Sequence, residues 1–139
     1  KYKEKFIEYI DADSESFHGV MDAFKLPKNN DEEKILRKET IQNALKHASE
    51  TPYKIAEDAY KLMDYSEKAV KHGNKNAVTD AAVSAMMARS AVLSALYNVK
   101  INLASINDSK FVATFEKKVS ALETNVVERE KQILSKVVI

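Results

Sequence analysis

An aspartate, Asp13, lies in the middle of a stripe of large apolar side chains and is the first candidate for chemistry. Successive members of the stripe are four, three, four, three and four residues apart, the spacing of one helix face: Phe6, Ile10, Asp13, Phe17, Val20 and Phe24. Burial of a carboxyl group raises its pKa, which suits an acid or base that works near neutral pH. The spacing leaves a structural role open, in which Asp13 hydrogen-bonds a neighbouring helix or pairs with a lysine.

A line of small polar residues along an otherwise apolar segment is the second candidate. At about 100° per residue, its members fall within roughly ±40° of one direction. They are Asp80, Ser84, Ser94, Asn98, Asn102 and Ser105, interspersed with Met87 and Ala91. A helix that is apolar around most of its circumference is expected to be buried, and buried amides and carboxylates need partners. The line is therefore either a polar network between helices or the wall of a binding site.

Other kinds of catalytic site are not indicated. His18, His47 and His72 share no helical spacing with a carboxylate that would suggest a metal site. The sequence contains no glycine-rich phosphate loop and no serine nucleophile elbow. It has no cysteine, which removes disulfides and thiolate nucleophiles and is compatible with a reducing compartment. An enzyme built from these residues is expected to use acid–base chemistry and positioning, without a metal or a tightly bound cofactor.

The composition favours long helices. With 139 residues, the chain is expected to form a single domain over residues 1–139. Only 2 glycines and 2 prolines, beside 45% hydrophobic and 31% charged residues, favour helices over sheets or disorder. The net charge of +1 predicts no binding to nucleic acid. The apolar run 81–106 contains Arg89, Lys100 and two asparagines, so no membrane span is predicted.

The apolar periodicity predicts an all-α bundle of about five helices with a long buried central helix. The first two are expected at about 3–24 and, after an Asn30 cap, at about 31–50. Thr51 and Pro52 are expected to start a third, which Gly73 ends in a left-handed cap. The fourth is the apolar segment with the polar line, and its residues Val83, Met86, Val92 and Leu96 are expected to be buried. The fifth, at about 108–138, carries an apolar seam that suits packing against a helix pair or a partner chain.

Several of these segments together resemble one known family. They are Ile10–Phe17, Lys25–Lys34, Gly73-Asn74, Thr79-Asp80, Tyr97–Leu103 and Ile106–Phe111. In order and spacing they are similar to the cyclodeaminase domain of formiminotransferase-cyclodeaminase. Single-domain bacterial cyclodeaminases and methenyltetrahydrofolate cyclohydrolases share the pattern. The family opens with a helical segment bearing a Pro-Gly-Gly-Gly-Ser motif that is not found here, so the chain is expected to be N-terminally incomplete relative to the family.

The resemblance implies a cytoplasmic, all-α homodimer with a tetrahydrofolate derivative, including polyglutamylated forms, as its substrate. In the cyclodeaminase reaction, the N10 nitrogen of 5-formiminotetrahydrofolate attacks the formimino carbon, and ammonia leaves to give 5,10-methenyltetrahydrofolate. The resemblance makes Asp13 the catalytic acid–base and assigns Asp80, Asn98 and Asn102 to substrate binding.

Two alternatives stay open. One is cyclohydrolase activity on the same scaffold, in which water attacks the methenyl carbon. The other is a non-catalytic helical assembly module whose polar line only fixes the register of the helices. The candidate residues would converge on a cleft in an enzyme and pair with one another in a dry core in a module.

Overall fold

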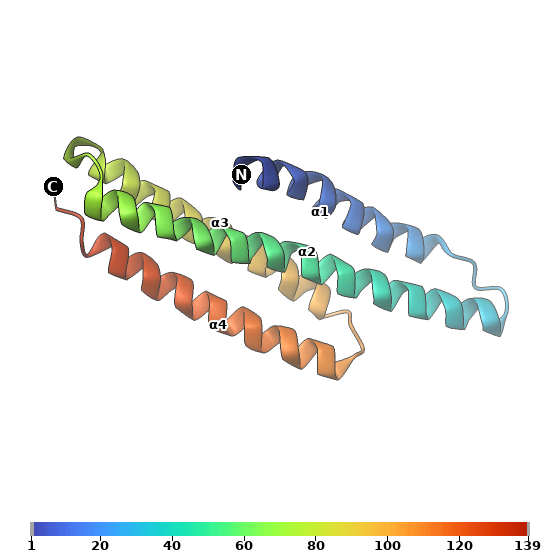
Figure 1. Ribbon diagram of the computed structural model, residues 1–139. Helices are drawn as coiled ribbons and strands as arrows, with labels where there is room; N and C mark the ends of the chain where they lie inside the picture. Colours follow the sequence, from blue (N-terminus) through green and yellow to red (C-terminus); the bar gives the residue numbers. More distant parts are fainter. Residues whose placement is uncertain (1, 139) are drawn as a thin grey trace.

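A computed structural model describes residues 2–138 of the chain, and these residues form α-helices without any strand (Figure 1). The elements are α1 (Tyr2–Lys25), α2 (Asp31–His72), the short 3-10 helix η1 (Lys75–Ala77), α3 (Val78–Leu103) and α4 (Ser109–Leu134). The all-α prediction is confirmed, but the described residues contain four α-helices rather than about five. The difference lies in α2, which joins the second and third expected helices.

Helix α2 begins as the sequence predicts. The Asn30 side chain accepts a hydrogen bond from the backbone N–H of Glu33 at 2.8 Å. In return, a Glu33 carboxylate oxygen accepts from the N–H of Asn29 at 2.7 Å. These two bonds satisfy N–H groups that have no partner within the first helical turn.

The predicted break at Thr51 and Pro52 is wrong, because Pro52 lies inside α2. A proline within a helix removes one N–H and leaves the carbonyl four residues earlier without its helical partner. That carbonyl belongs to Ala48, and the side-chain amide of Asn102 on α3 donates to it at 2.8 Å. A contact with a residue far away in the sequence therefore replaces the missing helical bond.

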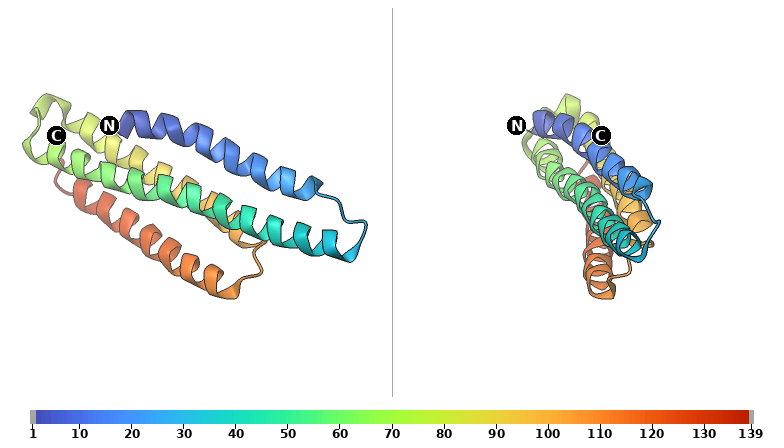
Figure 2. Two further views of the ribbon diagram at one scale, coloured as in Figure 1. Left: turned by 45° about the vertical axis from the view of Figure 1, so that its right-hand side comes forward. Right: turned by 90° about the vertical axis from the view of Figure 1, so that its right-hand side faces the viewer.

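The long helix α2 packs against each of the other three α-helices (Figure 2). Helices α1 and α4 lie on opposite sides of α2, and α3 runs along it (Figures 1 and 2). The side chains that are fully buried come from α2, α3 and α4, and the largest are Met63, Leu96, Ile133, Val92, Val99 and Val126. The apolar seam predicted on the last helix is thus used inside the chain.

Helix α3 is buried on one face only, which corrects part of the prediction for it. Val92 and Leu96 are fully buried, as expected. Val83 and Met86, also expected to be buried, are 53% and 43% exposed. The physical reason is that α2 and α4, the α-helices that mainly pack against α3, bury the face with Val92 and Leu96, whereas Val83 and Met86 lie outside that contact.

Gly73 ends α2, but without the predicted left-handed conformation. Its φ of −79° and ψ of −175° describe extended backbone. The Gly73 N–H donates to the carbonyl of Ala69 at 2.8 Å, and a Cβ at this position would collide with that oxygen. Glycine is required here by a close backbone approach rather than by a positive φ.

Candidate functional site

A groove runs between α1 and α3, and α2 forms its floor. It consists of two adjoining cavities of about 430 Å³ and about 500 Å³. Asp13, Ser14 and Asn98 line both cavities. The walls are otherwise largely apolar and come from Phe6, Tyr9, Ile10, Phe17, Val20, Pro52, Ile55, Ala95 and Ile101, with Asn102 in the second cavity. Apolar walls with a few convergent polar groups are typical of a small-molecule site.

Asp13 stands on the groove wall rather than in a closed core. Its neighbours on the predicted stripe, Ile10 and Phe17, are exposed, whereas Val20 one turn further is buried. Asp13 itself is half-buried. Among residues 2–138, no side chain pairs with its carboxylate, and the bond from Ser16 goes to its backbone carbonyl. The structure therefore offers neither the helix contact nor the lysine partner of the structural alternative.

Asn98 and Asn102 lie one turn apart on α3 and both reach the groove. Asn98 is exposed and lines both cavities beside Asp13. Asn102 is half-buried, and its amide nitrogen is engaged by the Ala48 carbonyl. Within residues 2–138 the Asn98 amide has no hydrogen-bond partner, so both its oxygen and its nitrogen are available to a ligand, whereas the nitrogen of Asn102 is already bonded.

Asp80 does not join the other three candidates within this chain. It is exposed in the first turn of α3, where a carboxylate interacts favourably with the helix dipole. Eighteen residues separate it from Asn98, a distance of about 27 Å along the helix axis. Ser84, the next polar residue of the line, bonds with the Ser66 hydroxyl at 2.7 Å. The polar line is thus part interhelical network and part groove wall.

A buried carboxylate beside the groove escaped the sequence analysis. Asp58 on α2 is only 3% exposed and accepts hydrogen bonds from the Tyr9 hydroxyl at 2.7 Å and from Lys61 at 2.9 Å. The ammonium group of Lys5 forms an ion pair with the same carboxylate. Tyr9 precedes Asp13 by one turn, so this cluster fixes the part of α1 that carries Asp13. Asp58 lies on the apolar stripe of α2, as Asp13 lies on that of α1. The same spacing argument could therefore have identified it from the sequence.

Comparisons with known proteins identify the family of the chain. The family model described as formiminotransferase-cyclodeaminase matches residues 1–121. The chain is 36% identical over 129 residues to the formimidoyltransferase-cyclodeaminase of Gallus gallus. The chain belongs to the formiminotransferase-cyclodeaminase family.

Two further relatives show how widely the family pattern extends. The chain is 38% identical over 102 residues, 73% of its length, to the methenyltetrahydrofolate cyclohydrolase of Methylorubrum extorquens. The crystal structure of formiminotetrahydrofolate cyclodeaminase from Thermotoga maritima matches with a TM-score of 0.78 and 25% identity. That match covers 94% of this chain and 61% of the Thermotoga chain. The 129 residues aligned with the Gallus protein are 93% of this chain, yet the chain spans only 23% of that protein and 49% of the cyclohydrolase.

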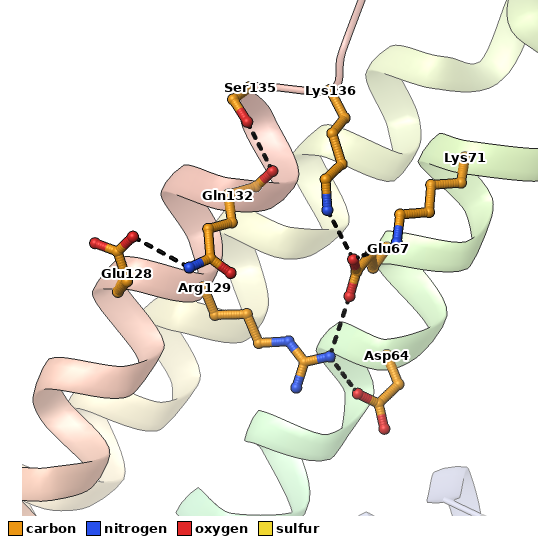
Figure 3. Close-up of polar contacts among 8 residues, drawn as sticks. All are labelled: Asp64, Glu67, Lys71, Glu128, Arg129, Gln132, Ser135 and Lys136. Carbon is orange, nitrogen blue, oxygen red and sulfur yellow. Dashed lines mark hydrogen bonds and ion pairs between the residues drawn. The ribbon is translucent and has the colours of Figure 1, made fainter.

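A second ionic cluster ties the end of α4 to α2 in this family member (Figure 3). Arg129 contacts Asp64 and Glu67, and Lys136 donates to Glu67 at 2.8 Å. Lys71 forms a further ion pair with Glu67. Hydrogen bonds from Lys136 and Lys71 hold the pKa of Glu67 at about 2. No member of this cluster lines the groove, so we assign it a structural role.

The described part of this family member contains no group of three or more His, Cys, Asp or Glu side chains arranged to hold a metal ion. None of its helices over residues 2–138 is long and apolar enough to cross a membrane.

We expect the Asp58 cluster to make folding sensitive to acid. Burial alone would raise the pKa of Asp58, but the bonds from Lys5, Lys61 and Tyr9 outweigh it and lower the pKa from 3.8 to about 2. A carboxyl group with a depressed pKa stabilises the fold above its unfolded-state pKa, and that contribution is lost as the pH falls toward 2. The contribution amounts to about 2 kcal/mol at neutral pH.

Urea unfolding of the wild type and of Asp58→Asn, at pH 6 and at pH 2.5, measures this contribution. The asparagine cannot titrate, so the wild type should be more stable at pH 6 and the difference should shrink at pH 2.5. A difference that stays the same at both pH values would show that the charge of Asp58 does not stabilise the fold.

Proposed function

We propose that the groove between α1 and α3 binds a folate one-carbon derivative and that this chain carries a formiminotetrahydrofolate cyclodeaminase site. Membership of the family supports the chemistry, and the names of the relatives point to folates. The observation that carries the proposal is that Asp13 and Asn98, which come from different helices, line the same groove. No side chain within residues 2–138 forms a hydrogen bond or ion pair with the Asp13 carboxylate, which leaves it available to a ligand.

In the proposed reaction, a bond forms between the N10 nitrogen of 5-formiminotetrahydrofolate and the formimino carbon. Asp13 accepts the proton that N10 loses. The formimino group reacts in its protonated form, so its nitrogen carries two hydrogens in the tetrahedral adduct. Asp13 returns the N10 proton to this nitrogen, the bond between it and the carbon breaks, and ammonia leaves. The product is 5,10-methenyltetrahydrofolate. No cofactor takes part, because the step moves protons and a C–N bond but no electrons between redox states.

Asn98 and Asn102 are the groups that we assign to the pterin. Its ring edge presents both donors and acceptors, and an amide side chain can match either. We assign Asp80 no role in this groove, because it lies far from Asn98 along α3.

Cyclohydrolase activity is the second candidate, favoured by the similarity to the Methylorubrum enzyme. The same carboxylate would then take a proton from the water that attacks the methenyl carbon. The test is to supply 5-formiminotetrahydrofolate and 5,10-methenyltetrahydrofolate separately and to follow the methenyl chromophore. A cyclodeaminase produces the chromophore from the first compound, and a cyclohydrolase removes it from the second faster than buffer does. If neither changes, the proposal is wrong and the helical assembly module takes its place.

We further expect a homodimer, through a different surface from the one predicted. The seam of α4 is buried within the chain, but α1 and α3 expose many large apolar side chains: Ile7, Ile10, Phe17, Met21, Phe24, Val83, Met86, Met87, Tyr97 and Ile101. An apolar surface of this kind is typical of an interface. Light scattering should give the mass of a dimer, and Ile101→Asp should shift it toward the monomer, since a charge at the interface opposes association. A monomeric mass over a wide concentration range would refute the dimer.

A cytoplasmic location and the acceptance of polyglutamylated folates belong to the same proposal. Binding of folates with one and with several glutamates would test the second point.

A further inference from the structure

Pro52 is an unusual residue for the middle of a helix that lines a groove. It is fully buried within α2 and lies on the floor of the first cavity. In a regular helix, the N–H of residue 52 would bond to the carbonyl of Ala48, but proline has no N–H. The proline ring also crowds the carbonyl four residues earlier. The Ala48 carbonyl therefore lacks its helical hydrogen bond, and Ala48 is only 5% exposed.

The side-chain amide of Asn102 replaces the N–H that Pro52 lacks. Its Nδ2 donates to the Ala48 carbonyl oxygen at 2.8 Å, across the boundary between α3 and α2. A carbonyl oxygen can only accept, so this bond determines which end of the amide faces Ala48. The opposite end, Oδ1, receives no hydrogen bond from residues 2–138 and is left as an acceptor. Both Ala48 and Asn102 line the second cavity of the groove.

We propose that Pro52 is a positioning residue for ligand binding. By lacking an N–H, it frees the Ala48 carbonyl to hold the Asn102 amide in one orientation, with Oδ1 available to a donor on the ligand. A donor N–H at the edge of a pterin ring is the matching group. The ligand in this inference rests on the proposed function, whereas the link between Pro52 and Asn102 does not.

A double-mutant cycle on unfolding tests the link without any folate. The four proteins are the wild type, Pro52→Ala, Asn102→Ala and the double variant, unfolded in urea. In the wild-type background, Asn102→Ala leaves the Ala48 carbonyl unpaired, and the unfolding equilibrium constant should rise about tenfold or more. In the Pro52→Ala background, the new N–H of residue 52 bonds to Ala48, so the same change should have a much smaller effect. Equal effects in the two backgrounds would overturn the proposal.

Steady-state kinetics with 5-formiminotetrahydrofolate, or with 5,10-methenyltetrahydrofolate if that is the substrate, test the positioning role. Pro52→Ala lets the Asn102 amide turn, so KM should rise severalfold while kcat stays near the wild-type value. A purely structural role of Pro52 would leave KM unchanged. Pro27→Ala is the matched control, because Pro27 is the other proline of the chain and lies exposed between α1 and α2. Its KM should equal that of the wild type.

The outcomes separate this inference from the proposed function. The unfolding cycle could show coupling between Pro52 and Asn102 while the KM of Pro52→Ala stays unchanged. That result would overturn the positioning role and leave the proposed function intact. If the wild type converts neither folate, the proposed function fails and the folate part of this inference fails with it. The unfolding cycle then still decides whether Pro52 controls the Asn102 amide.

Discussion

Replacement of Asp13 by asparagine should lower the turnover of 5-formiminotetrahydrofolate by a factor of about 10² to 10⁴. Asparagine has nearly the same size but cannot accept the N10 proton or return it to the departing amine. Because no side chain within residues 2–138 pairs with the Asp13 carboxylate, the change removes no hydrogen bond from the fold. The melting temperature and folate affinity of Asp13→Asn should therefore stay close to those of the wild type. Initial rates, thermal melts and equilibrium binding on the same preparations measure all three quantities.

Asn98→Ala is the companion variant for that experiment, since Asn98 lines the same groove and forms no side-chain hydrogen bond with residues 2–138. The truncated amide leaves a polar group of the ligand unpaired, so binding should weaken by about 1–3 kcal/mol. The main effect should be on KM, in contrast to the effect on kcat at Asp13. Wild-type turnover by Asp13→Asn, or its failure to fold, would show that Asp13 is structural and that the catalytic assignment is wrong.

Replacement of Leu96 by alanine should lower the free energy of unfolding by about 2–5 kcal/mol. Leu96 is fully buried on the face of α3 that packs in the core. Its truncation loses the transfer free energy of the side chain and leaves a cavity that neighbouring helices can fill only in part. Urea unfolding followed by circular dichroism measures the loss, and an unchanged slope with urea would indicate that the cooperative fold persists.

Ile101→Ala is the matched control on the same helix. Ile101 is 71% exposed, so the monomer should change in stability by no more than about 0.5 kcal/mol. Without ligand, any additional loss should grow with protein concentration, because association would bury this side chain. Equal losses for Leu96→Ala and Ile101→Ala at low concentration would contradict the assignment of the two faces of α3.

The helical boundaries that depend on local chemistry were predictable. The Asn30 cap needs only its own side chain and the N–H of Glu33, and the structure contains that bond. The helix boundary predicted at Pro52 is wrong, because a local rule treats proline as a helix start or break. The rule fails where a distant residue, Asn102, satisfies the carbonyl that proline leaves without a partner.

Burial along α3 shows the same division between local and distant causes. The apolar composition of this helix predicted burial of four residues, and the prediction is correct for Val92 and Leu96 but not for Val83 and Met86. Hydrophobicity indicates which side chains would stabilise the fold if they were buried. The number and placement of neighbouring helices decide which of them are covered. In this chain the neighbours α2 and α4 cover one side.

For the candidate site, the sequence alone determined that the chain is helical and that Asp13 and the asparagines of α3 lie on defined helix faces. Helical periodicity is sufficient for this, because it relates residues within one helix. Only the tertiary structure decided that Asp13 and Asn98 meet at one groove, that Asp80 lies apart from it and that Asp58 anchors α1 beside it. These outcomes depend on how α1 and α3 are placed on α2, and that placement follows from packing and hydrogen bonds between residues far apart in the chain, which no periodicity within a single helix encodes.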